Sequence, residues 1–460
     1  MTKNWWQRDP FRTLRREIGK TKVLTQPEEL YLYGFDATEE RALPSAVVFP
    51  ETTADVQAVV RFAHAEATTI TPRGAGTGLS GGSVPVAGGI VLSTERMTQI
   101  KRMDPEKRVA IVQPGVVTAI IQEEANKHGL FYPPDPSSYT VSTIGGNIAE
   151  NAGGLRCFKY GVTSHYVLGL EFVDAQGNIR KTGALDERDT EPDLTALLTG
   201  SEGTLGIITH AALRLIEAPE TTVTISAFVS EAETAFALIE GIVQRGWVPS
   251  VLEYIDNVSL EASANHIGIE YPEDAKAMLL IELDGSRDHV DGLLPHIIAL
   301  LEEEALQVEV ATTSVARESL WQLRRGISPS LIRHAANSIH EDVAVPRGSL
   351  YKLVHKVHSL SGEYNLRIAV YGHAGDGNLH VVIMYDGKSN TEKVKANEVA
   401  KEIFKSAIEM GGTITGEHGV GHAKRAYLSW QISPQAIKLM KGIKKKLDPD
   451  GIFNPGKVLE

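Results

Sequence analysis

Apolar residues recur with helical spacing in two segments of the N-terminal half. Residues 52–66 begin with a threonine suited to cap a helix, and residues 117–129 end at a glycine suited to stop one. Short apolar runs between them predict strands, and residues 165–183 predict a hairpin with a tight turn at 175–178. We therefore predict an α+β domain with many short strands over residues 1–217.

The pattern changes in the second half, where the order strand, helix, strand occurs twice. The segments are 221–229, 231–246 and 249–256, followed by 276–285, 287–305 and 307–313. This duplication predicts a ferredoxin-like antiparallel sheet with helices on one face, as a cap domain over residues 218–424. Residues 425–460 predict a helix and a Pro/Gly-punctuated tail that returns to the first domain.

Glycines cluster between the predicted strands, first in "TPRGAGTGLSGG" (71–82). Gly76, Gly78 and Gly81 fit the dinucleotide pattern G-x-G-x-x-G, but that pattern requires a helix to begin directly afterwards. Here Pro85 and a strand follow, so a Rossmann site is excluded. Two explanations remain open: a loop whose bare amides bind phosphate, which we favour, and a glycine-rich surface turn.

Two further glycine-rich segments, 132–161 and 199–209, occur in the same half of the chain. Three separated loops of this kind predict a long, extended phosphate ligand rather than a mononucleotide. The net charge of −12 and the absence of a basic run argue against a nucleic acid partner. The single cysteine, Cys157, excludes an internal disulfide and an iron–sulfur cluster held by this chain alone.

The chain has no apolar run long enough for a transmembrane helix and no signal-peptide pattern at its start. We therefore expect a cytoplasmic protein. Trp5 and Trp6 lie beside several arginines, which leaves contact with the inner face of the membrane or with a partner subunit as an alternative. The simpler explanation is a terminal segment folded onto its own domain.

Histidines occur among glycines in "YGHAGDGNLHV" (371–381), where His373 and His380 are seven residues apart. On one straight strand this odd spacing puts the two rings on opposite faces. The turn signal at Asp376–Gly377 predicts a fold-back that brings them together, close enough to share a metal ion with Glu417 as third ligand. The alternative is a pair of solvated histidines at a hairpin tip.

Six motifs in order then extend over nearly the whole chain: "PRGAGTGLSGG", "PPDPSS" with "TIGGNIAENAGG", "GSEGTLGIIT", "GHAGDGNLH", "GEHGVG" and "FNPGK". Together they resemble the FAD-linked oxidases of the vanillyl-alcohol-oxidase superfamily, in the branch of D-lactate, glycolate and D-2-hydroxyglutarate dehydrogenases. The resemblance implies FAD bound in extended form with its ring against the cap domain. Thr77 stands where members with covalent flavin often carry histidine, which favours non-covalent FAD.

The resemblance also implies which residues form the site. His373, His380 and Glu417 would hold a divalent metal, expected to be zinc or manganese, although Fe(II) also suits this ligand set. His418 would be the general base, because imidazole titrates near neutral pH, and Arg324 would bind the substrate carboxylate. The implied FAD contacts are Pro72, Arg73, Gly74, Ala75, Gly76, Thr77, Gly78, Ser80, Gly81, Pro134, Asp135, Thr143, Gly145, Gly146, Asn147, Asn151, Gly153, Gly154, Glu202, Gly206, Ile207, Ile208 and Asn454.

The function implied is oxidation of a small D-2-hydroxyacid to the 2-oxoacid, with the hydride passing to FAD. Some members carry an extra basic residue for a second substrate carboxylate. No lysine lies in the corresponding segment, where Arg333, His334 and His340 are the only candidates. D-lactate or glycolate is therefore favoured over D-2-hydroxyglutarate.

An external electron acceptor is required: a quinone, a cytochrome, an electron-transfer flavoprotein or an iron–sulfur subunit. A homodimer is compatible with the resemblance. An alternative from a different class of enzyme is a metal-dependent hydrolase of a phosphate-bearing substrate. It would use the same histidines and glycine loops.

Overall fold

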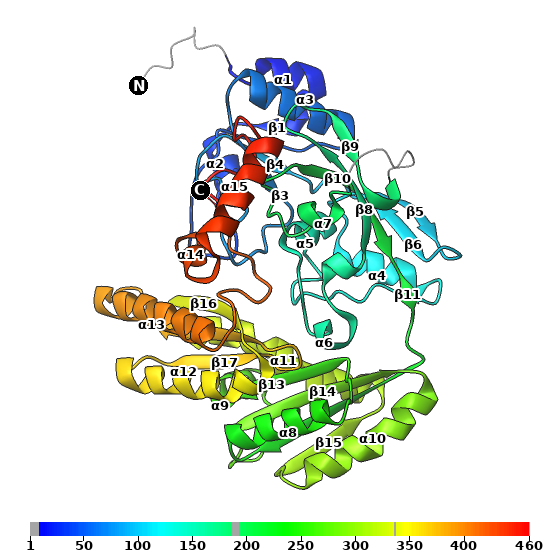
Figure 1. Cartoon of the computed structure of the whole chain (residues 1–460), viewed down its shortest axis with the longest axis vertical. Helices are drawn as coiled ribbons and strands as arrows, with labels where there is room; N and C mark the ends of the chain where they lie inside the picture. The colour runs from blue at the N-terminus through cyan, green and yellow to red at the C-terminus, as the bar shows by residue number, and fades with distance from the viewer. Residues whose placement is uncertain (1–8, 186–192, 335–336, 460) are drawn as a thin grey trace.

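The chain forms two lobes along its long axis (Figure 1). The computed structural model describes residues 9–185, 193–334 and 337–459, so Trp5 and Trp6 lie outside the described part. The first lobe ends with β11 (Ile216–Glu217), and the second begins with β12 (Thr221–Val229). The predicted boundary at residues 217 and 218 falls between these two strands.

The first lobe contains two main sheets and therefore has the predicted α+β character. One sheet has the order β1 (Val23–Leu24), β2 (Ala46–Val48), β4 (Ile90–Ser93) and β3 (Ile70–Arg73), and its last three strands are parallel. The other is antiparallel, with the order β5 (Ile100–Asp104), β6 (Val109–Val112), β10 (Ile207–Arg214), β8 (Val167–Val173) and β9 (Ile179–Lys181). The pairing of β8 with β9 is the predicted hairpin. β7 (Leu130–Phe131) pairs with β11.

The predicted helices of this lobe are α3 (Thr53–Ala65) and α4 (Thr118–Asn126). Thr52 caps α3: its hydroxyl accepts the backbone N–H of Asp55, and the Asp55 carboxylate accepts the N–H of Thr52. The apolar face of α3 packs with α1 (Arg12–Ile18) in one core cluster of the lobe. Shorter helices are α2 (Pro27–Leu30), α5 (Ile144–Glu150), α6 (Cys157–Tyr160) and α7 (Thr195–Leu198).

The second lobe is built on one seven-stranded antiparallel sheet. Its first four strands, β12, β13 (Val251–Asp256), β14 (Ala277–Gly285) and β15 (Gln307–Ala311), lie in the spatial order β15-β12-β14-β13. This is the ferredoxin-like order predicted from the duplicated pattern. The sheet continues through β17 (Ile368–His373) and β18 (Asn378–Tyr385) to β16 (Asn337–Ala344).

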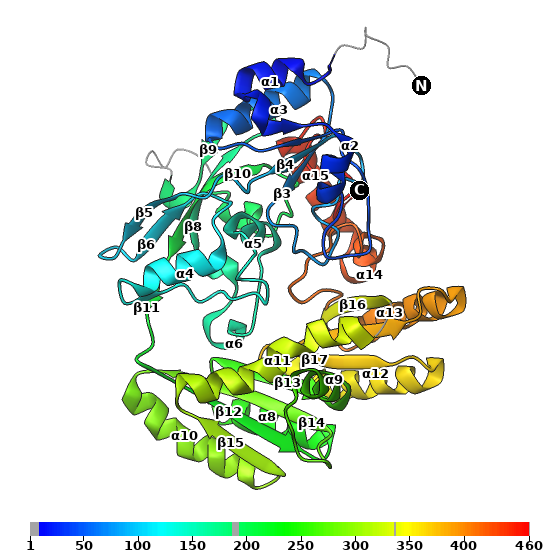
Figure 2. The same cartoon turned by 180° about the vertical axis from the view of Figure 1, so that it is seen from behind.

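Helices cover both faces of this sheet, whereas the sequence predicted one. One face carries α8 (Ala232–Gln244), α10 (Arg287–Glu302), α12 (Leu350–Tyr364) and α13 (Asn390–Glu409), as Figure 1 shows. The opposite face, seen in Figure 2, carries α9 (Asn257–Ile267) and α11 (Ser314–His334). The physical reason is that β13 and β18 are buried at every position, so both sides of the sheet need an apolar cover.

The C-terminal segment lies on the first lobe. It contains α14 (Leu428–Gln431) and α15 (Pro434–Leu447), and its end runs beside β3. Asn454 donates its backbone N–H to the carbonyl of Ile70 at 2.7 Å, and Phe453 is fully buried. Among the described residues, no helix is long and apolar enough to cross a bilayer.

Candidate active site

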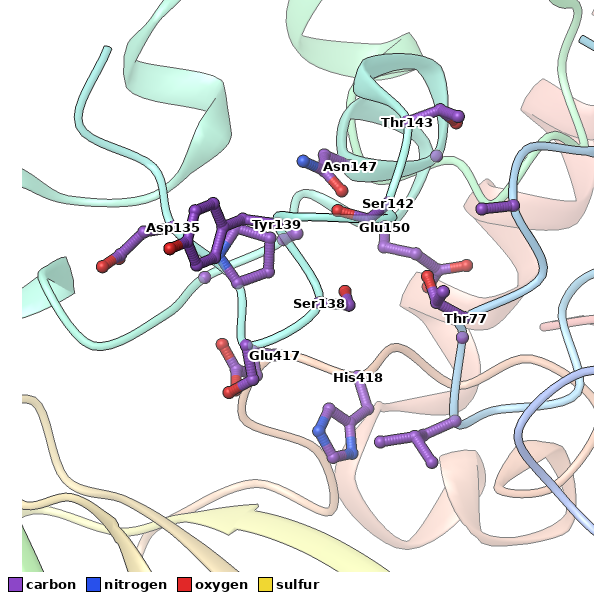
Figure 3. A pocket seen from close by; sticks show the side chains of 18 of the residues that line it. Thr77, Asp135, Ser138, Tyr139, Ser142, Thr143, Asn147, Glu150, Glu417 and His418 are labelled. Atoms are coloured by element: carbon purple, nitrogen blue, oxygen red, sulfur yellow. The ribbon is translucent and has the colours of Figure 1, made fainter. Parts of the chain in front are cut away.

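A cavity of about 1050 Å³ lies where the two lobes meet. The three glycine-rich segments line it from the first lobe, and residues of α11, β16 and the 417–418 loop line it from the second. Figure 3 looks into this cavity and shows Glu417 and His418 facing Thr77, Asp135 and Glu150. Pockets of this kind typically bury most of a cofactor-sized ligand.

The glycine loop after β3 presents free backbone donors to the cavity. No acceptor in the described part of the chain takes the N–H groups of residues 74–78, all of which line the cavity. Gly76 has a φ of +72°, and a Cβ at this position would overlap the guanidinium of Arg73. Arg73 itself donates to the carbonyl of Phe35 at 2.6 Å, so it holds the loop in shape. Consecutive unpaired amides are suited to phosphate oxygens.

The second glycine segment forms the start of α5. Ser142 and Thr143 have buried hydroxyls without a hydrogen-bond partner, and both line the cavity beside Gly146. Asn147 donates to the hydroxyl of Thr118 at 2.6 Å, which fixes the helix against α4. Buried polar atoms are normally paired. A bound ligand with polar groups therefore fits this wall of the cavity.

Most of the predicted FAD contacts line the cavity. They are Pro72, Arg73, Gly74, Ala75, Gly76, Thr77, Gly78, Asp135, Thr143, Gly145, Gly146, Asn147, Gly153, Glu202, Gly206, Ile207 and Ile208. The remaining ones, which do not line it, are Ser80, Gly81, Pro134, Asn151, Gly154 and Asn454. Asn454, for example, donates to the carbonyls of Gly82 and Glu202, so it joins two of the lining segments.

The three predicted metal ligands come together at the cavity. The hairpin of β17 and β18 folds back at Gly377 (φ +90°), and His380 pairs across it with Tyr371. His373 and His380 consequently approach through their Nε2 atoms at 3.4 Å. Glu417 Oε1 lies 3.2 Å from His373 Nε2 and 3.4 Å from His380 Nε2. Two nitrogens and one carboxylate oxygen so arranged are suited to a divalent ion.

Glu253 and Asp342 orient this group, and the sequence prediction missed both. Glu253 on β13 accepts from His373 Nδ1 at 2.5 Å, which directs Nε2 toward Glu417. Burial raises the pKa of Glu253, but the charges of His373 and Arg324 outweigh it and lower the pKa to about 2. The available signal was a carboxylate inside the apolar run "SVLEYID", because such a charge needs buried partners.

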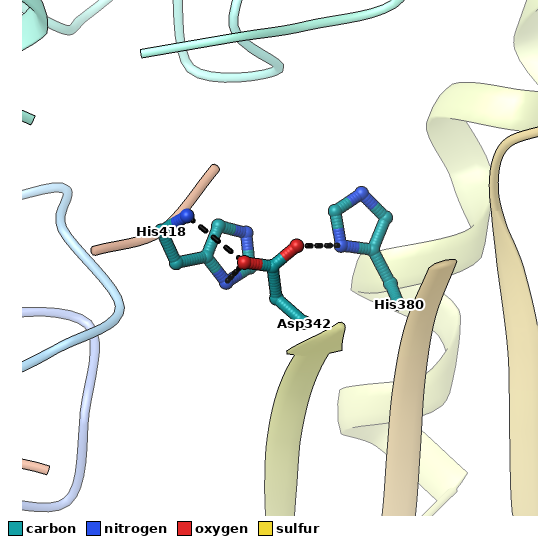
Figure 4. A group of neighbouring side chains, drawn as sticks. All are labelled: Asp342, His380 and His418. Carbon is teal, nitrogen blue, oxygen red and sulfur yellow. Dashed lines mark hydrogen bonds and ion pairs between the residues drawn. The ribbon is translucent and has the colours of Figure 1, made fainter. Parts of the chain in front are cut away.

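Asp342 on β16 holds the loop that carries the predicted base. Its Oδ2 atom accepts the backbone N–H groups of Gly416, Glu417 and His418 at 2.8 to 2.9 Å. Burial raises the pKa of Asp342, and the charges of His418 and Lys424 lower it well below its usual range. Figure 4 shows that Asp342 also faces His380.

His418 lies at the cavity with one nitrogen free. Its ring stacks on that of His380 with centroids 5.2 Å apart, and its Nδ1 is buried without a hydrogen-bond partner. Asp342 Oδ2 lies 4.0 Å from this nitrogen. The backbone at Gly419 has a φ of +84°, which lets the chain turn directly after His418. A ring held in this way can take up a proton from a group in the cavity.

Arg324 presents a free donor to the same cavity from α11. Its Nε donates to Glu253 at 2.6 Å, and its guanidinium carbon lies 4.8 Å from the ring centre of Tyr371. Its Nη2 atom is buried without a partner. Arg325 also lines the cavity, but it is exposed and already pairs with Glu318. Arg324 therefore has a donor available for an anion in the cavity, whereas the charge of Arg325 is already paired.

Three further residues of the second lobe can be placed relative to the cavity. Trp321 and His340 line the cavity, with Trp321 donating to Glu282 at 3.1 Å and His340 bonded to the hydroxyl of Ser338. Arg333 is exposed and contacts His266.

Comparisons with known proteins place the chain in a family. Residues 44–183 match an FAD binding domain, and residues 218–458 match the C-terminal domain of FAD linked oxidases. The chain is 41% identical to the glycolate oxidase subunit GlcD of Bacillus subtilis, over 93% of this chain and 92% of that protein. It is 33% identical to a D-lactate dehydrogenase of Anaerostipes hadrus, over 96% of each chain.

Two more comparisons extend this result. A D-2-hydroxyglutarate dehydrogenase of Stutzerimonas stutzeri is 32% identical over 98% of both chains. The solved structure of p-cresol methylhydroxylase superposes with a TM-score of 0.80 at 18% identity, over 98% of this chain and 96% of that one. The chain therefore belongs to the FAD-linked oxidases, as an FAD-dependent oxidoreductase with a flavin domain of the vanillyl-alcohol-oxidase type.

Proposed function

We propose that the protein oxidises a small D-2-hydroxyacid to the 2-oxoacid in a flavin- and metal-dependent reaction, with D-lactate or glycolate as the favoured substrate. The observation that supports this most directly is the convergence of Arg324, His418 and Glu417 on one cavity with the glycine loops. The names of the relatives, glycolate oxidase subunit and D-lactate dehydrogenase, support the substrate class.

The residues present fit both FAD and a divalent ion. The free amides of residues 74–78 and the unpaired hydroxyls of Ser142 and Thr143 suit a phosphate-bearing cofactor. The donor atoms of His373, His380 and Glu417 lie within 4.8 Å of one another, as the ligands of one ion must. When bound, FAD supplies a ring that accepts a hydride, and the ion supplies a Lewis acid that acidifies the substrate hydroxyl.

The remaining roles in the reaction belong to side chains of the protein. Arg324 binds the substrate carboxylate through Nη2, because its Nε is already committed to Glu253. His418 accepts the hydroxyl proton at a ring nitrogen, and Asp342 stabilises the positive ring that results. Trp321 and Tyr371 line the cavity and limit the access of water.

D-2-hydroxyglutarate is the alternative substrate. It needs a second cation. Of the two predicted candidates whose side chains the structure describes, Arg333 and His340, only His340 lines the cavity, and the side chain of His334 lies outside the described part. His340 is already hydrogen-bonded to Ser338 at 2.8 Å, and burial lowers its pKa, which disfavours the charged ring. This supports a monocarboxylate. Membership of the FAD-linked oxidases removes the basis for the hydrolase alternative.

Electrons must leave to an external acceptor, because the only cysteine, Cys157, excludes a cluster bound by this chain alone. A quinone, a cytochrome, an electron-transfer flavoprotein or an iron–sulfur subunit would each serve. Substrate oxidation is therefore best measured at the flavin itself, without an assumed acceptor.

Anaerobic bleaching of the flavin absorbance tests the proposal. The purified protein is mixed with D-lactate, L-lactate, glycolate or D-2-hydroxyglutarate, before and after treatment with a chelator and readdition of Zn²⁺ or Mn²⁺. We expect rapid bleaching by D-lactate or glycolate that the chelator abolishes and the metal restores. Bleaching that is unaffected by complete metal removal, verified by elemental analysis, would refute the metal dependence.

A further inference from the structure

The carboxyl group of Glu150 is not used by the proposed reaction, yet it faces the cavity. Glu150 is the last residue of α5 and lines the cavity wall between Ser142 and Thr77, as Figure 3 shows. Its Oε2 atom is sealed from solvent and has no hydrogen-bond partner. Only Oε1 is left to meet a ligand in the cavity.

Among the described residues, no positively charged side chain bonds to Glu150 or lowers its pKa. Glu202 lies beside it, and both carboxylates crowd Gly419, where a Cβ would overlap Glu150 Oε2 and lie 3.0 Å from Glu202 Oε1. The nearby N–H groups of Val420 and Gly421 already donate to Glu202, at 2.8 and 2.6 Å. Glu150 therefore has no donor of its own.

The physical consequence is an uncharged carboxyl group. Burial raises the pKa of Glu150 well above its usual range, and the negative charges of Glu202 and Asp36 raise it further. When two carboxylates share a buried site, one of them generally stays protonated. Burial raises the pKa of Glu202 as well, but two backbone N–H groups and the charges of Lys457 and Lys424 oppose this effect, so Glu202 is the one that keeps the charge.

The position of Glu150 decides which part of FAD it meets. The free amides at residues 74–78 suit the phosphates. On the proposed function, the ring would lie near His418 and Arg324, because these residues would bind the substrate whose hydride it accepts. Gly419, which Glu150 contacts, directly follows His418 in the chain. The Glu150 carboxyl group therefore lies at the ring end of the cavity.

We propose that Glu150 is a positioning residue that presents an uncharged carboxyl group, through Oε1, to the isoalloxazine ring of bound FAD and thereby keeps the flavin easy to reduce. Reduction adds electrons to the ring. A negative carboxylate in contact with it, in a site with few screening waters, would oppose reduction, whereas a neutral hydrogen-bonding group does not.

The test uses the FAD-loaded protein and three measurements that need no hydroxyacid: the midpoint potential of the flavin against a reference dye, its visible spectrum, and the dissociation constant of FAD. The variants are Glu150→Gln, which keeps a neutral hydrogen-bonding group, and Glu150→Ala, which removes it. Glu123→Gln, at an exposed position of α4, serves as the matched control.

We expect Glu150→Gln and the control to keep the wild-type potential. Glu150→Ala should shift the visible spectrum and weaken FAD binding by about tenfold, the order expected for one hydrogen bond. If Glu150→Ala does not retain FAD, Glu150→Met fills the same space without a polar group and should still shift the spectrum.

Two results would overturn the inference. A rise of about 30 mV or more in the potential of Glu150→Gln, a tenfold change in the equilibrium constant of reduction, would mean that the native carboxyl is charged. Unchanged spectrum, potential and FAD affinity in Glu150→Ala would mean that the group does not contact the ring. Neither result depends on which hydroxyacid is the substrate, so the inference and the proposed function fail separately.

Discussion

Single oxygen and nitrogen atoms define the geometry of the site. Asp342 Oδ2 alone accepts three consecutive backbone N–H groups and the hydroxyl of Thr415, which fixes the loop that carries Glu417 and His418. Glu253 in turn contacts both His373 and Arg324. The carboxylate of Glu253 thus links the predicted metal ligand His373 to the predicted anion-binding residue Arg324. Two substitutions separate the roles of the residues that these carboxylates hold.

Replacing His418 by glutamine should slow flavin bleaching by the substrate by about two to four orders of magnitude, the usual contribution of a general base. Glutamine keeps a similar size but does not take up a proton. FAD absorbance and metal content should remain those of the native protein, because neither group is bound through this side chain in the proposed arrangement. A bleaching rate within a factor of a few of the native rate would contradict the assignment.

Arg324 and Arg325 are neighbours with different environments and provide a matched pair. Arg324→Gln should raise the substrate concentration needed for half-maximal bleaching by at least tenfold, because the substrate carboxylate loses its charged hydrogen-bond donor. Arg325→Gln should change it little, since Arg325 is exposed at the edge of the cavity lining and is already paired with Glu318. Substrate titrations of both variants test this, and equal effects would place the anion site elsewhere.

The elements differ in how clearly the sequence specifies them. The hairpin of β17 and β18 was predicted from a turn signal between two apolar runs. Helix α3 was predicted from its N-terminal threonine cap and its apolar face. The long helix α11 was not predicted, because its sequence is polar for its length and contains Pro329. Arg324 was nevertheless chosen, from the family resemblance alone. Its contact with Glu253 could not be predicted, because it depends on how α11 lies across the sheet.

The cap of α3 gives a prediction for the stability of the first lobe. Thr52→Ala removes the hydroxyl that accepts the N–H of Asp55 and should lower the free energy of unfolding by about 1 kcal/mol. Thr53→Val changes the next residue without touching the cap, but it removes a bond to Glu171. Thr52→Ser, which keeps the hydroxyl, is therefore the better control and should stay near the native value in urea unfolding.

Glu171 on β8 joins three elements and makes the lobe sensitive to acid. Its Oε1 atom meets His210 on β10 at 2.8 Å and Thr53 on α3 at 2.9 Å. The hydrogen bond to His210 is the largest cause that lowers the pKa of Glu171 to about 2. Because the folded pKa is depressed, this stabilisation is present above the usual value of 4.5 and is lost as the pH falls toward 2.

Glu171→Gln should therefore be less stable than the native protein above pH 4.5, and the difference should shrink as the pH approaches 2. Urea unfolding of both proteins across this range measures the difference directly. A constant difference over the whole range would show that the charge of Glu171 does not contribute.

The relation between the lobes could not be predicted from either half alone. The motifs that line each side of the cavity were predicted separately from the sequence. How the two sides lie against each other depends on contacts between residues far apart in the chain. Lys159 and Tyr160 on α6 of the first lobe bind Asp284 on β14 of the second, with Lys159 Nζ at 2.5 Å and the tyrosine hydroxyl at 2.9 Å. Asp284 is only 3% exposed and lies at the wall of the cavity, so these bonds join the lobes beside the site.

Asp284→Ala should loosen this contact between the lobes. It removes the buried partner of a charged amine, a change that typically costs about 3 kcal/mol. We expect a lower midpoint of thermal unfolding and slower bleaching by substrate, because Arg324 and the flavin wall belong to different lobes. Metal content should be unchanged. The control is Asp288→Ala, at an exposed position at the start of α10, which should behave as the native protein. If both variants behave alike, the contact of Asp284 does not hold the lobes together.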